Sequence, residues 1–335
     1  MYYLLHFLGT VTAIQTDDED RFEQCFMALG PSIVGFQNCI RPVVAVDACH
    51  LKGRYKGRLF IATSMDGNVR IFPIAFGVGA TENDEYWSWF FMNLRRAIGF
   101  VEDLVVISYR YLSIEKACRS IFPHAVFGIC MYHLGMNMKA KFKVRAEDFL
   151  YRAAKAYTEM DYKEAMHVVQ NTNKPVYDYL MEADPRKWSR CYFLSKRYSI
   201  MTTNIAESMN AVLRDAREYP LIGMLETIQT MLQSWFHDRH RDAVNMPGPM
   251  TPKVEKKLTK RDDFSRRFKV NPITDSRFHM IDGFRNARVD IANRTCSCRV
   301  FDLTELPCAH AIRGLRERGL SIYSACSRYG IIRNV

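Results

Sequence analysis

The sequence contains 335 residues, of which 48% are hydrophobic and 25% are charged, and its 47 Lys and Arg residues outnumber its 36 Asp and Glu residues. This composition excludes a wholly disordered chain, and the length favours two domains over one small secreted domain. No segment approaches the roughly 20 apolar residues of a membrane span, and the apolar opening at residues 1–14 lacks the basic start of a signal peptide.

The excess positive charge lies mainly in one segment. Residues 1–100 contain 9 basic and 10 acidic side chains, whereas residues 251–300 contain 13 basic and 6 acidic side chains. Such clustering is typical of a protein that binds a polyanion, although a merely solvated surface gives the same pattern. Six of the ten cysteines are scattered and four lie in the last 40 residues, which favours reduced thiols in an intracellular protein with no membrane partner.

Three strands are predicted near the start of the chain. Residues 1–40 form a lead-in with a possible edge strand, and apolar runs follow at Val43–Val46, Arg58–Ser64 and Val69–Val78. The Asp66-Gly67-Asn68 sequence between the last two runs is typical of a hairpin, because glycine accepts a positive φ angle. The sequence therefore predicts an antiparallel meander.

Helices and strands alternate after the meander. The patterns predict a helix at Glu82–Ile98, a strand at Leu104–Ser108, a helix at Ser113–Ile121, a strand at Val126–Ile129 and a helix at about Tyr132–Lys143. Together with the meander, this order predicts an α/β domain whose mixed sheet is covered by helices on its faces, in a ribonuclease H-like layout.

The chain is expected to divide into segments of different composition. The α/β core is predicted at residues 41–145, an all-helical insertion with a further helix at 146–240, a basic linker rich in proline at 241–285, a zinc finger at 286–320 and a tail at 321–335.

The strongest chemical motif lies near the end of the sequence. Cys296, Cys298, Cys308 and His310 fall within 15 residues and match the Cys3His set of a structural zinc site. Residues 300–303 are predicted to form a strand between the two pairs, and Pro307 to open a helix that bears Cys308 and His310. The alternative is two disulfides or inert thiols. The motif resembles the SWIM zinc finger, which could also contact other proteins.

Asp47 follows a buried apolar run, where a carboxylate can bind a hard cation or simply form a turn.

The segment around Asp47 belongs to a wider resemblance: the chain resembles the Mutator-like transposase family over roughly residues 20–317. The resemblance rests on Val44–Gly57, Ala62–Pro73, Asn83–Phe90, Val105–Ala117, Phe122-Pro123, Cys130-Met-Tyr-His133 and Thr203–Asn210, with the SWIM finger after them.

The resemblance implies a ribonuclease H-like catalytic domain in which three acidic residues hold two magnesium or manganese ions for DNA strand cleavage and transfer. Asp47 matches the first acidic position and Glu207 the third, whereas Tyr109 occupies the second. A neutral phenol adds no negative charge at pH 7, so activity is not expected. Asp66 and Asp103 are poor substitutes, because one belongs to the hairpin and the other precedes its strand.

Two of these motifs allow structural explanations as well. Asn204 and Glu207 have the spacing of a capping box, so Glu207 could close a helix start. Cys130 and His133 could ligate a metal or serve as a structural pair, and without two further ligands nearby in sequence packing is the favoured explanation.

Nucleic-acid contacts are predicted in two basic segments that contain aromatic residues. The candidate side chains are Arg186, Lys187, Trp188, Arg190, Lys196, Arg197, Lys256, Lys257, Lys260, Arg261, Arg266 and Arg267. The family usually has a sequence-reading domain before the core, and the residues before Asp20 are too few to form one.

The sequence thus predicts a transposase-derived protein that binds DNA and zinc in the nucleus but does not cut DNA. One alternative is a co-opted regulatory DNA-binding module. Another is an active metal-dependent strand transferase in which a substituted ligand replaces the second acid.

Overall fold

The structure is a computed structural model that describes residues 8–54, 56–143, 147–281, 283 and 285–331. The chain forms two compact units, which we call unit 1 (residues up to 134, and 202–247) and unit 2 (residues 135–201 and 248–332). Parts of the apolar opening and of the predicted tail lie outside the described residues. Among the described helices, none is long and apolar enough to cross a membrane.

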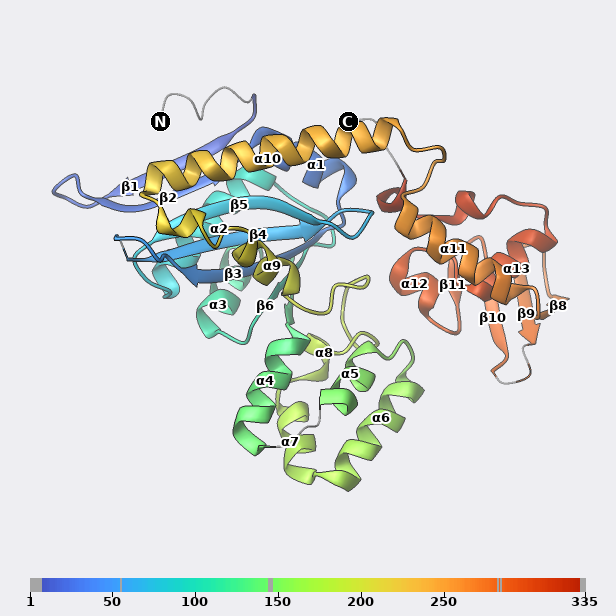
Figure 1. The fold of residues 1–335 in the computed structure, drawn as a ribbon. Helices are drawn as coiled ribbons and strands as arrows, with labels where there is room; N and C mark the ends of the chain where they lie inside the picture. The colour runs from blue at the N-terminus through green and yellow to red at the C-terminus, as the bar shows by residue number, and fades with distance from the viewer. Residues whose placement is uncertain (1–7, 55, 144–146, 282, 284, 332–335) are drawn as a thin grey trace. The chain divides into compact units, whose positions relative to one another are not determined.

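Unit 1 contains a seven-stranded mixed sheet with the strand order β1-β2-β5-β4-β3-β6-β7 (Figure 1). The strands are β1 (Val11–Thr16), β2 (Phe22–Ala28), β3 (Val43–His50), β4 (Arg58–Met65), β5 (Ile71–Gly79), β6 (Val105–Ser108) and β7 (Val126–Ile129). Strands β3, β4 and β5 pair antiparallel, and β6 pairs in parallel with both β3 and β7. The prediction of an α/β domain with a mixed sheet is confirmed.

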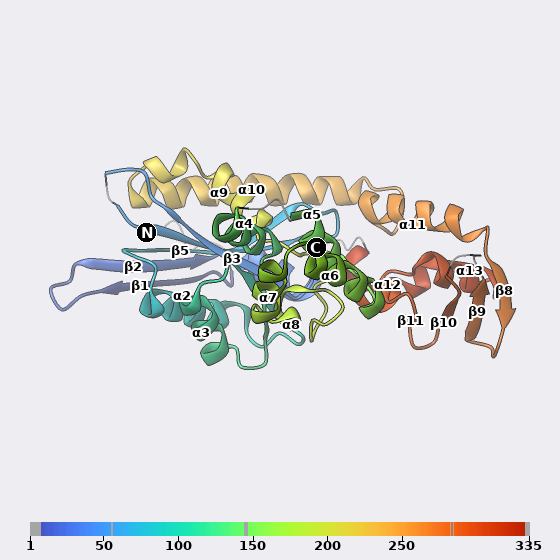
Figure 2. The same ribbon diagram turned by 90° about the horizontal axis from the view of Figure 1, so that it is seen from below.

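Helices cover both faces of this sheet, with α2 and α3 on one side and α9 and α10 on the other (Figure 2). The helices with residues in unit 1 are α1 (Gly30–Cys39), α2 (Asp84–Ile98), α3 (Leu112–Ile121), α4 (Met131–Phe142), α9 (Asn204–Val212) and α10 (Leu221–Val244), with a 3-10 turn η2 (Ala216–Glu218).

The two covered faces follow from the alternation of side chains along each strand. In β4, Leu59 and Ile61 belong to the same buried cluster as Ile228 of α10. Phe60 between them points to the opposite face, where its ring centroid lies 4.8 Å from that of Trp87 in α2. Successive residues of one strand therefore fill two separate layers of the core.

Two local details of unit 1 differ from the prediction. The positive φ angle in the β4–β5 turn occurs at Val69, at 65°, because the Asp66 side chain closes the turn by accepting the amides of Asn68 and Arg70. Helix α2 begins at Asp84, since the Asn83 side chain accepts the Tyr86 amide at 3.0 Å and caps the helix. Glu82 therefore lies in the loop before the helix.

Unit 2 begins with α-helices, and its second part combines a small sheet with three further α-helices. Its first part contains α5 (Glu147–Lys155), α6 (Glu159–Thr172), α7 (Lys174–Glu182) and α8 (Pro185–Trp188). Its second part contains α11 (Pro252–Ser265), β8 (Lys269–Pro272), β9 (Arg277–Ile281), β10 (Ala287–Asp290), β11 (Thr295–Cys296), α12 (Val300–Thr304), α13 (Ala309–Glu317), and the 3-10 turns η3 (Ile322–Ala325) and η4 (Arg328–Gly330). The four strands have the order β11-β10-β9-β8.

The basic segment predicted as a linker is ordered, which corrects that prediction. Most of residues 252–281 form α11, β8 and β9. Pro252 occupies the first turn of α11, where proline has no missing hydrogen bond, and Val254 and Leu258 are buried against Ile312 of α13. The prolines therefore mark a helix start, and the apolar residues between the lysines attach the helix to the finger.

The segment between the two zinc-ligand pairs is also different from the prediction. Residues 300–304 form helix α12 and not a strand. The chain turns at Arg299, which has a φ angle of 60°, and Asp302 accepts the Cys296 amide at 3.0 Å. A turn and a short helix therefore connect the two pairs.

Candidate functional site

The four predicted zinc ligands lie together in unit 2. One ligand atom from each of Cys296, Cys298, Cys308 and His310 lies within 4.8 Å of all the others. His310 Nδ1 lies 3.8 Å from the Sγ atom of Cys296 and 4.0 Å from that of Cys308. Cys308 is the residue before α13, and its Sγ accepts the Ala311 amide at 3.4 Å. The start of the helix thus positions two of the ligands.

The chemistry of this cluster fits zinc. Hydrogen bonds with the Cys298 and Cys308 thiols, and burial, raise the pKa of Cys296. A divalent cation bound between the three sulfur atoms would favour their thiolate forms instead. All ten cysteines are free thiols, which rules out the disulfide alternative in this structure. The His310 ring is stacked on Phe268 with the ring centroids 4.7 Å apart, and this contact fixes the plane of the imidazole. Four protein ligands leave no open position, so the ion would stabilise the fold.

A second site lies at one edge of the large sheet in unit 1. Strands β3 and β6 are parallel with Ala45 opposite Ile107, so Asp47 and Tyr109 lie two residues further along adjacent chain segments. Because side chains alternate, these two residues extend from the same face. Strand β3 continues to His50 through its pairing with β4, so Asp47 lies within the strand and not at its end.

Asp47 is buried and held by helix α9. Asp47 is only 8% exposed, and its Oδ2 accepts a hydrogen bond of 2.8 Å from Asn210 Nδ2. Burial raises the pKa of Asp47 to about 6, while the nearby Ala48 amide and His133 lower it and the carboxylates of Glu207 and Glu82 raise it. A substantial fraction of this carboxyl group is therefore neutral near pH 6.

Tyr109 contacts a carboxylate that the sequence analysis did not identify. Its hydroxyl donates a hydrogen bond to Glu82 Oε1, and the Tyr111 hydroxyl donates to the Glu82 carbonyl oxygen at 2.8 Å. Arg58 Nε lies 3.9 Å from the other carboxylate oxygen of Glu82. Burial and the hydrogen bond to Glu82 raise the pKa of Tyr109, so the phenol stays protonated.

The position of Glu82 follows from the topology. Gly79, near the end of β5, pairs with Arg58 at the start of β4, and Arg58 pairs with His50 at the end of β3. The end of β5 therefore reaches the same sheet edge as the ends of β3 and β6. A rule that collects acidic residues following each strand at a shared edge would have found Glu82.

Glu207 lies beside the Cys130 and His133 pair. Its Oε1 is 3.7 Å from His133 Nδ1 and accepts a hydrogen bond of 3.0 Å from the Thr203 hydroxyl. The predicted capping box with Asn204 does not form, because Thr203 precedes the helix and Asn204 is its first residue.

The Cys130 and His133 side chains perturb one another. Burial raises the pKa of Cys130, but hydrogen bonds from His133 and Thr203 outweigh it and lower the pKa overall. The pKa of His133 is raised, chiefly by its hydrogen bond with Cys130. The His133 ring also lies 5.6 Å from the Tyr109 ring. The structure thus brings Asp47, Tyr109 and Glu207 into one neighbourhood.

Three of the predicted nucleic-acid contacts are buried and cannot reach a ligand, which corrects those assignments. Trp188 is fully buried and donates through Nε1 to the Leu180 carbonyl. Arg197 is 2% exposed and donates to the carbonyls of Lys187, Ile200 and Met201. The Arg190 guanidinium lies 4.3 Å from the Tyr157 ring centroid. These side chains hold the fold of unit 2.

The other candidates differ in their availability. Arg261 donates to the carbonyls of Leu306 and Pro307, next to the zinc ligands, and Lys196 and Arg186 form ion pairs with Glu305 and Asp184. Lys187 is only partly exposed. Lys256, Lys257, Lys260, Arg266 and Arg267 are exposed, as is Arg186, and Arg266 forms an ion pair with Asp263.

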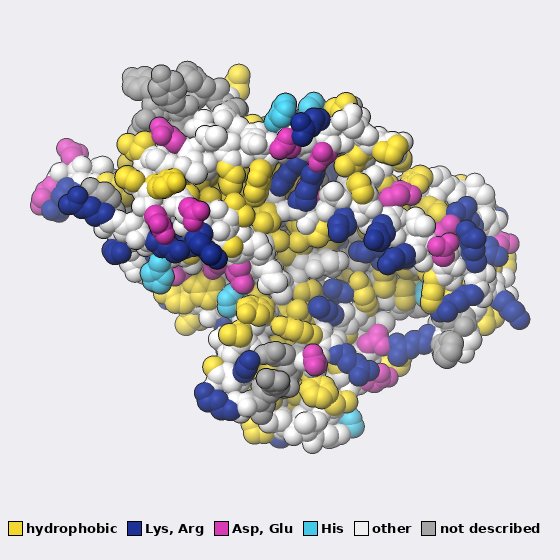
Figure 3. Space-filling model, viewed as in Figure 1, with side chains coloured by type: hydrophobic (Ala, Val, Ile, Leu, Met, Phe, Trp, Pro, Cys, Tyr) yellow, Lys and Arg dark blue, Asp and Glu magenta, His cyan; other side chains and the backbone are white. Residues whose placement is uncertain are grey.

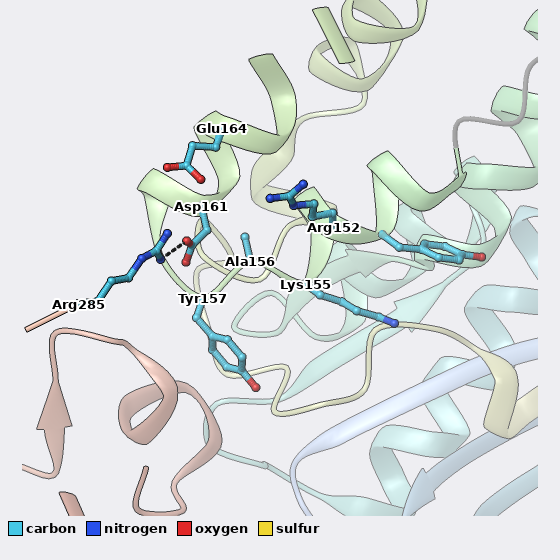
Figure 4. A pocket seen from close by; sticks show the side chains of 8 residues that line it. Arg152, Lys155, Ala156, Tyr157, Asp161, Glu164 and Arg285 are labelled. Carbon is cyan, nitrogen blue, oxygen red and sulfur yellow. Dashed lines mark hydrogen bonds and ion pairs between the residues drawn. The ribbon is translucent and has the colours of Figure 1, made fainter. Parts of the chain in front are cut away.

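Unit 2 also contains a pocket of mixed charge (Figure 4). Arg285, from the segment between β9 and β10, forms an ion pair with Asp161 of α6. The pocket contains three basic side chains and two carboxylates, so it has little net charge. Its lining residues are Tyr151, Arg152, Lys155, Ala156, Tyr157, Asp161, Glu164 and Arg285.

Comparison with known proteins identifies two parts of the chain. The family model of the MULE transposase domain matches residues 43–137, and that of the SWIM zinc finger matches residues 281–313. No curated protein matches the chain. A matching solved structure is titled as a simian T-cell lymphotropic virus intasome in complex with PP2A regulatory subunit B56 gamma, with 9% identity and a TM-score of 0.21. That match covers 48% of this chain and 52% of the other. The protein therefore contains a MULE transposase domain followed by a SWIM zinc finger.

Proposed function

We propose that this chain is a transposase-derived protein that binds DNA and a structural zinc ion but does not cut DNA. The observation behind this proposal is the position of Tyr109, which lies beside Asp47 at the sheet edge and donates a hydrogen bond to Glu82. A protonated phenol replaces a carboxylate at the point where a second acid would be needed.

The proposal takes the core of unit 1 to be ribonuclease H-like. The order β5-β4-β3-β6-β7, with three antiparallel strands followed by two parallel ones, supports this assignment. So does the placement of candidate acids on adjacent chain segments at one sheet edge, which is where ligands bind in open α/β sheets.

The side chains at this edge do not fit a pair of magnesium ions. Two-metal cleavage requires carboxylates that bridge or flank two ions about 3.5–4 Å apart. Here Asp47 is buried, partly neutral near pH 6 and bound to Asn210, while Glu207 is bound to Thr203. Tyr109 brings no charge. We therefore expect no metal-dependent cleavage.

DNA binding is supported by the exposed basic residues of unit 2. Lys256, Lys257 and Lys260 project from α11, and Arg266 and Arg267 follow it. In Figure 3, Lys and Arg side chains are distributed over this part of the surface, with acidic side chains between them. Such a surface favours phosphate contacts that carry no sequence information, and it supports a nuclear location.

A nicking assay tests the proposed loss of cleavage. Supercoiled plasmid incubated with the full chain and Mg²⁺ or Mn²⁺ should remain intact, and Tyr109→Asp should introduce metal-dependent nicking if the remaining geometry is sound. Tyr109→Asn serves as the control, since it shortens the side chain without adding charge. Nicking by the unchanged chain, abolished in Asp47→Ala, would reject the proposal.

A binding assay tests the DNA interaction. The triple change of Lys256, Lys257 and Lys260 to Ala should lower affinity for a generic duplex and reduce the salt slope by roughly one to three units, because about one counterion is released per neutralised phosphate. The control replaces three exposed lysines of other helices, namely Lys116, Lys163 and Lys174. Equal affinity for both triple variants and the unchanged chain would exclude α11 as the contact surface.

One observation favours a second candidate, an active strand transferase with a substituted ligand. Glu82 offers a carboxylate next to Tyr109 and close enough to Asp47 to raise its pKa. In that case the unchanged chain would nick DNA with Mn²⁺, and both Asp47→Ala and Glu82→Gln would abolish nicking. A co-opted regulator would instead select a defined DNA sequence from a random pool.

A further inference from the structure

Three side chains of different chemistry meet at the back of the sheet-edge site. Cys130 follows strand β7, His133 lies in the first turn of α4 and Glu207 lies in the first turn of α9. One ligand atom of each lies within 4.8 Å of the other two. Within the described part of the chain, only this group and the SWIM cluster bring together three or more His, Cys, Asp or Glu side chains in this way.

The backbone around these residues is fixed by hydrogen bonds. The Cys130 amide donates to the Ser108 carbonyl at 2.8 Å, and the Leu134 amide donates to the Cys130 carbonyl at 3.0 Å. The Thr203 amide donates to Cys130 Sγ at 3.2 Å, and the Glu207 amide donates to the Thr203 carbonyl at 3.0 Å. The three side chains therefore have a rigid common support.

We propose that Cys130, His133 and Glu207 bind one divalent transition-metal ion of the zinc class, separate from the ion of the finger. A thiolate, an imidazole and a carboxylate form a mixed ligand set that suits Zn²⁺ or Co²⁺, whereas Mg²⁺ prefers oxygen ligands alone. Three protein ligands leave the fourth position open to water or to a small anionic ligand.

The spacing of two of the ligand atoms agrees with such a site. Ligand bonds of 2.0–2.3 Å in a tetrahedral zinc site place neighbouring ligand atoms roughly 3.3–3.8 Å apart. The distance from His133 Nδ1 to Glu207 Oε1 is 3.7 Å. Cys130 is fully buried, whereas the side chains of His133 and Glu207 are 30% and 34% exposed. An ion can therefore approach from the side of the imidazole and the carboxylate.

The Thr203 hydroxyl marks the centre of the group. Its oxygen lies 3.3 Å from Cys130 Sγ, 3.3 Å from His133 Nδ1 and 3.0 Å from Glu207 Oε1. A hydroxyl has one proton, so it can donate to only one of these three atoms at a time. A cation bound by all three atoms would satisfy them together once the Thr203 side chain has rotated out of the centre, and Thr203 would then act as an outer partner that orients a ligand.

Metal analysis of the full chain tests this inference without any DNA assay. After dialysis against micromolar Zn²⁺ and removal of loosely bound ions, we expect about two zinc ions per chain. His133→Gln and Glu207→Gln should each leave about one. Cys118→Ser, which alters a buried thiol of unit 1 outside both clusters, should keep two.

Two further measurements keep the test decisive if a variant is unstable. Co²⁺ exchanged into the unchanged chain should give a cobalt–thiolate absorption that decreases in Cys130→Ser, and Thr203→Val should weaken zinc affinity roughly 10-fold or more. A stoichiometry of one zinc in the unchanged chain would overturn the inference, as would a count that none of the ligand variants changes. Either outcome leaves the proposed DNA binding unaffected.

Discussion

The zinc cluster of unit 2 and the sheet-edge site of unit 1 are built from similar side chains by opposite routes. The finger ligands span residues 296–310, and one turn and one helix start bring them together. The sheet-edge residues come from positions 47, 82, 109, 130, 133 and 207, on five separate segments, because 130 and 133 share the junction between β7 and α4. The comparison teaches that a short motif specifies its own geometry, whereas a site assembled by a sheet depends on every strand that supports it.

The largest expected effect comes from removing a finger ligand. Cys298→Ala should abolish zinc binding and unfold residues from about 286 onward, because zinc binding contributes folding free energy on the order of 10 kcal/mol in small fingers. Limited proteolysis with mass mapping, together with zinc analysis, measures both effects. Cys326→Ala is the control, since Cys326 is a buried thiol in the same unit but outside the cluster. A protease-resistant finger without zinc would contradict the assignment.

An intermediate effect is expected from the buried carboxyl of unit 1. The folded pKa of Asp47, about 6, lies above its ordinary value of 3.8, so its stabilising contribution is complete below pH 4 and is lost as pH rises through 6. Asp47→Asn should therefore raise the free energy of unfolding at pH 7.5 by roughly 2–3 kcal/mol and change little at pH 4. Denaturant titrations at both pH values measure this.

A carboxyl group whose pKa is shifted in the opposite direction provides the control for that experiment. The pKa of Asp84 is lowered, chiefly by a hydrogen bond with Lys116, so Asp84→Asn should reduce stability above pH 4 and not increase it. Equal pH profiles for the two variants would mean that Asp47 is not buried as the structure has it.

The smallest effect is expected at the Tyr109 hydroxyl. Tyr109→Phe removes the hydrogen bond that the phenol donates to the Glu82 carboxylate and should cost about 1–2 kcal/mol in unfolding free energy. Tyr111→Phe removes a bond to the Glu82 carbonyl and should cost about 1 kcal/mol, because a neutral acceptor binds more weakly. A larger loss in Tyr111→Phe would argue against a charged Glu82.

Local sequence patterns were sufficient to predict the helices and strands of the core and the zinc ligands of the finger. The apolar periodicity predicted the strands and helices of the core, and ligand spacing predicted the Cys3His cluster. Glu82 was missed because it precedes a helix whose start was placed two residues too early, and its partner lies 27 residues away. Its contact depends on two strands ending at the same edge, which no local window contains.

Burial accounts for the other errors. Trp188 and Arg197 lie in a segment that has the composition of a nucleic-acid contact, yet tertiary packing encloses them and backbone carbonyls satisfy their donors. The prolines before α11 suggested a linker, but Val254 and Leu258 supply an apolar face that only the finger completes. In both cases the composition of the segment was described correctly, but the sequence does not indicate which residues pack against it.

The hydrogen bond between the Thr203 amide and Cys130 Sγ has a consequence for the segment that lies between these two residues in the sequence. The chain leaves unit 1 after residue 134 and returns at residue 202, and this bond joins the two crossing points at 3.2 Å. The intervening segment is thus an insertion whose first and last residues are held next to each other by this hydrogen bond. Changes of length within residues 135–201 therefore strain unit 1 little, since the ends that must be rejoined already touch, and they act instead on the packing of this segment with residues 248–332 in unit 2.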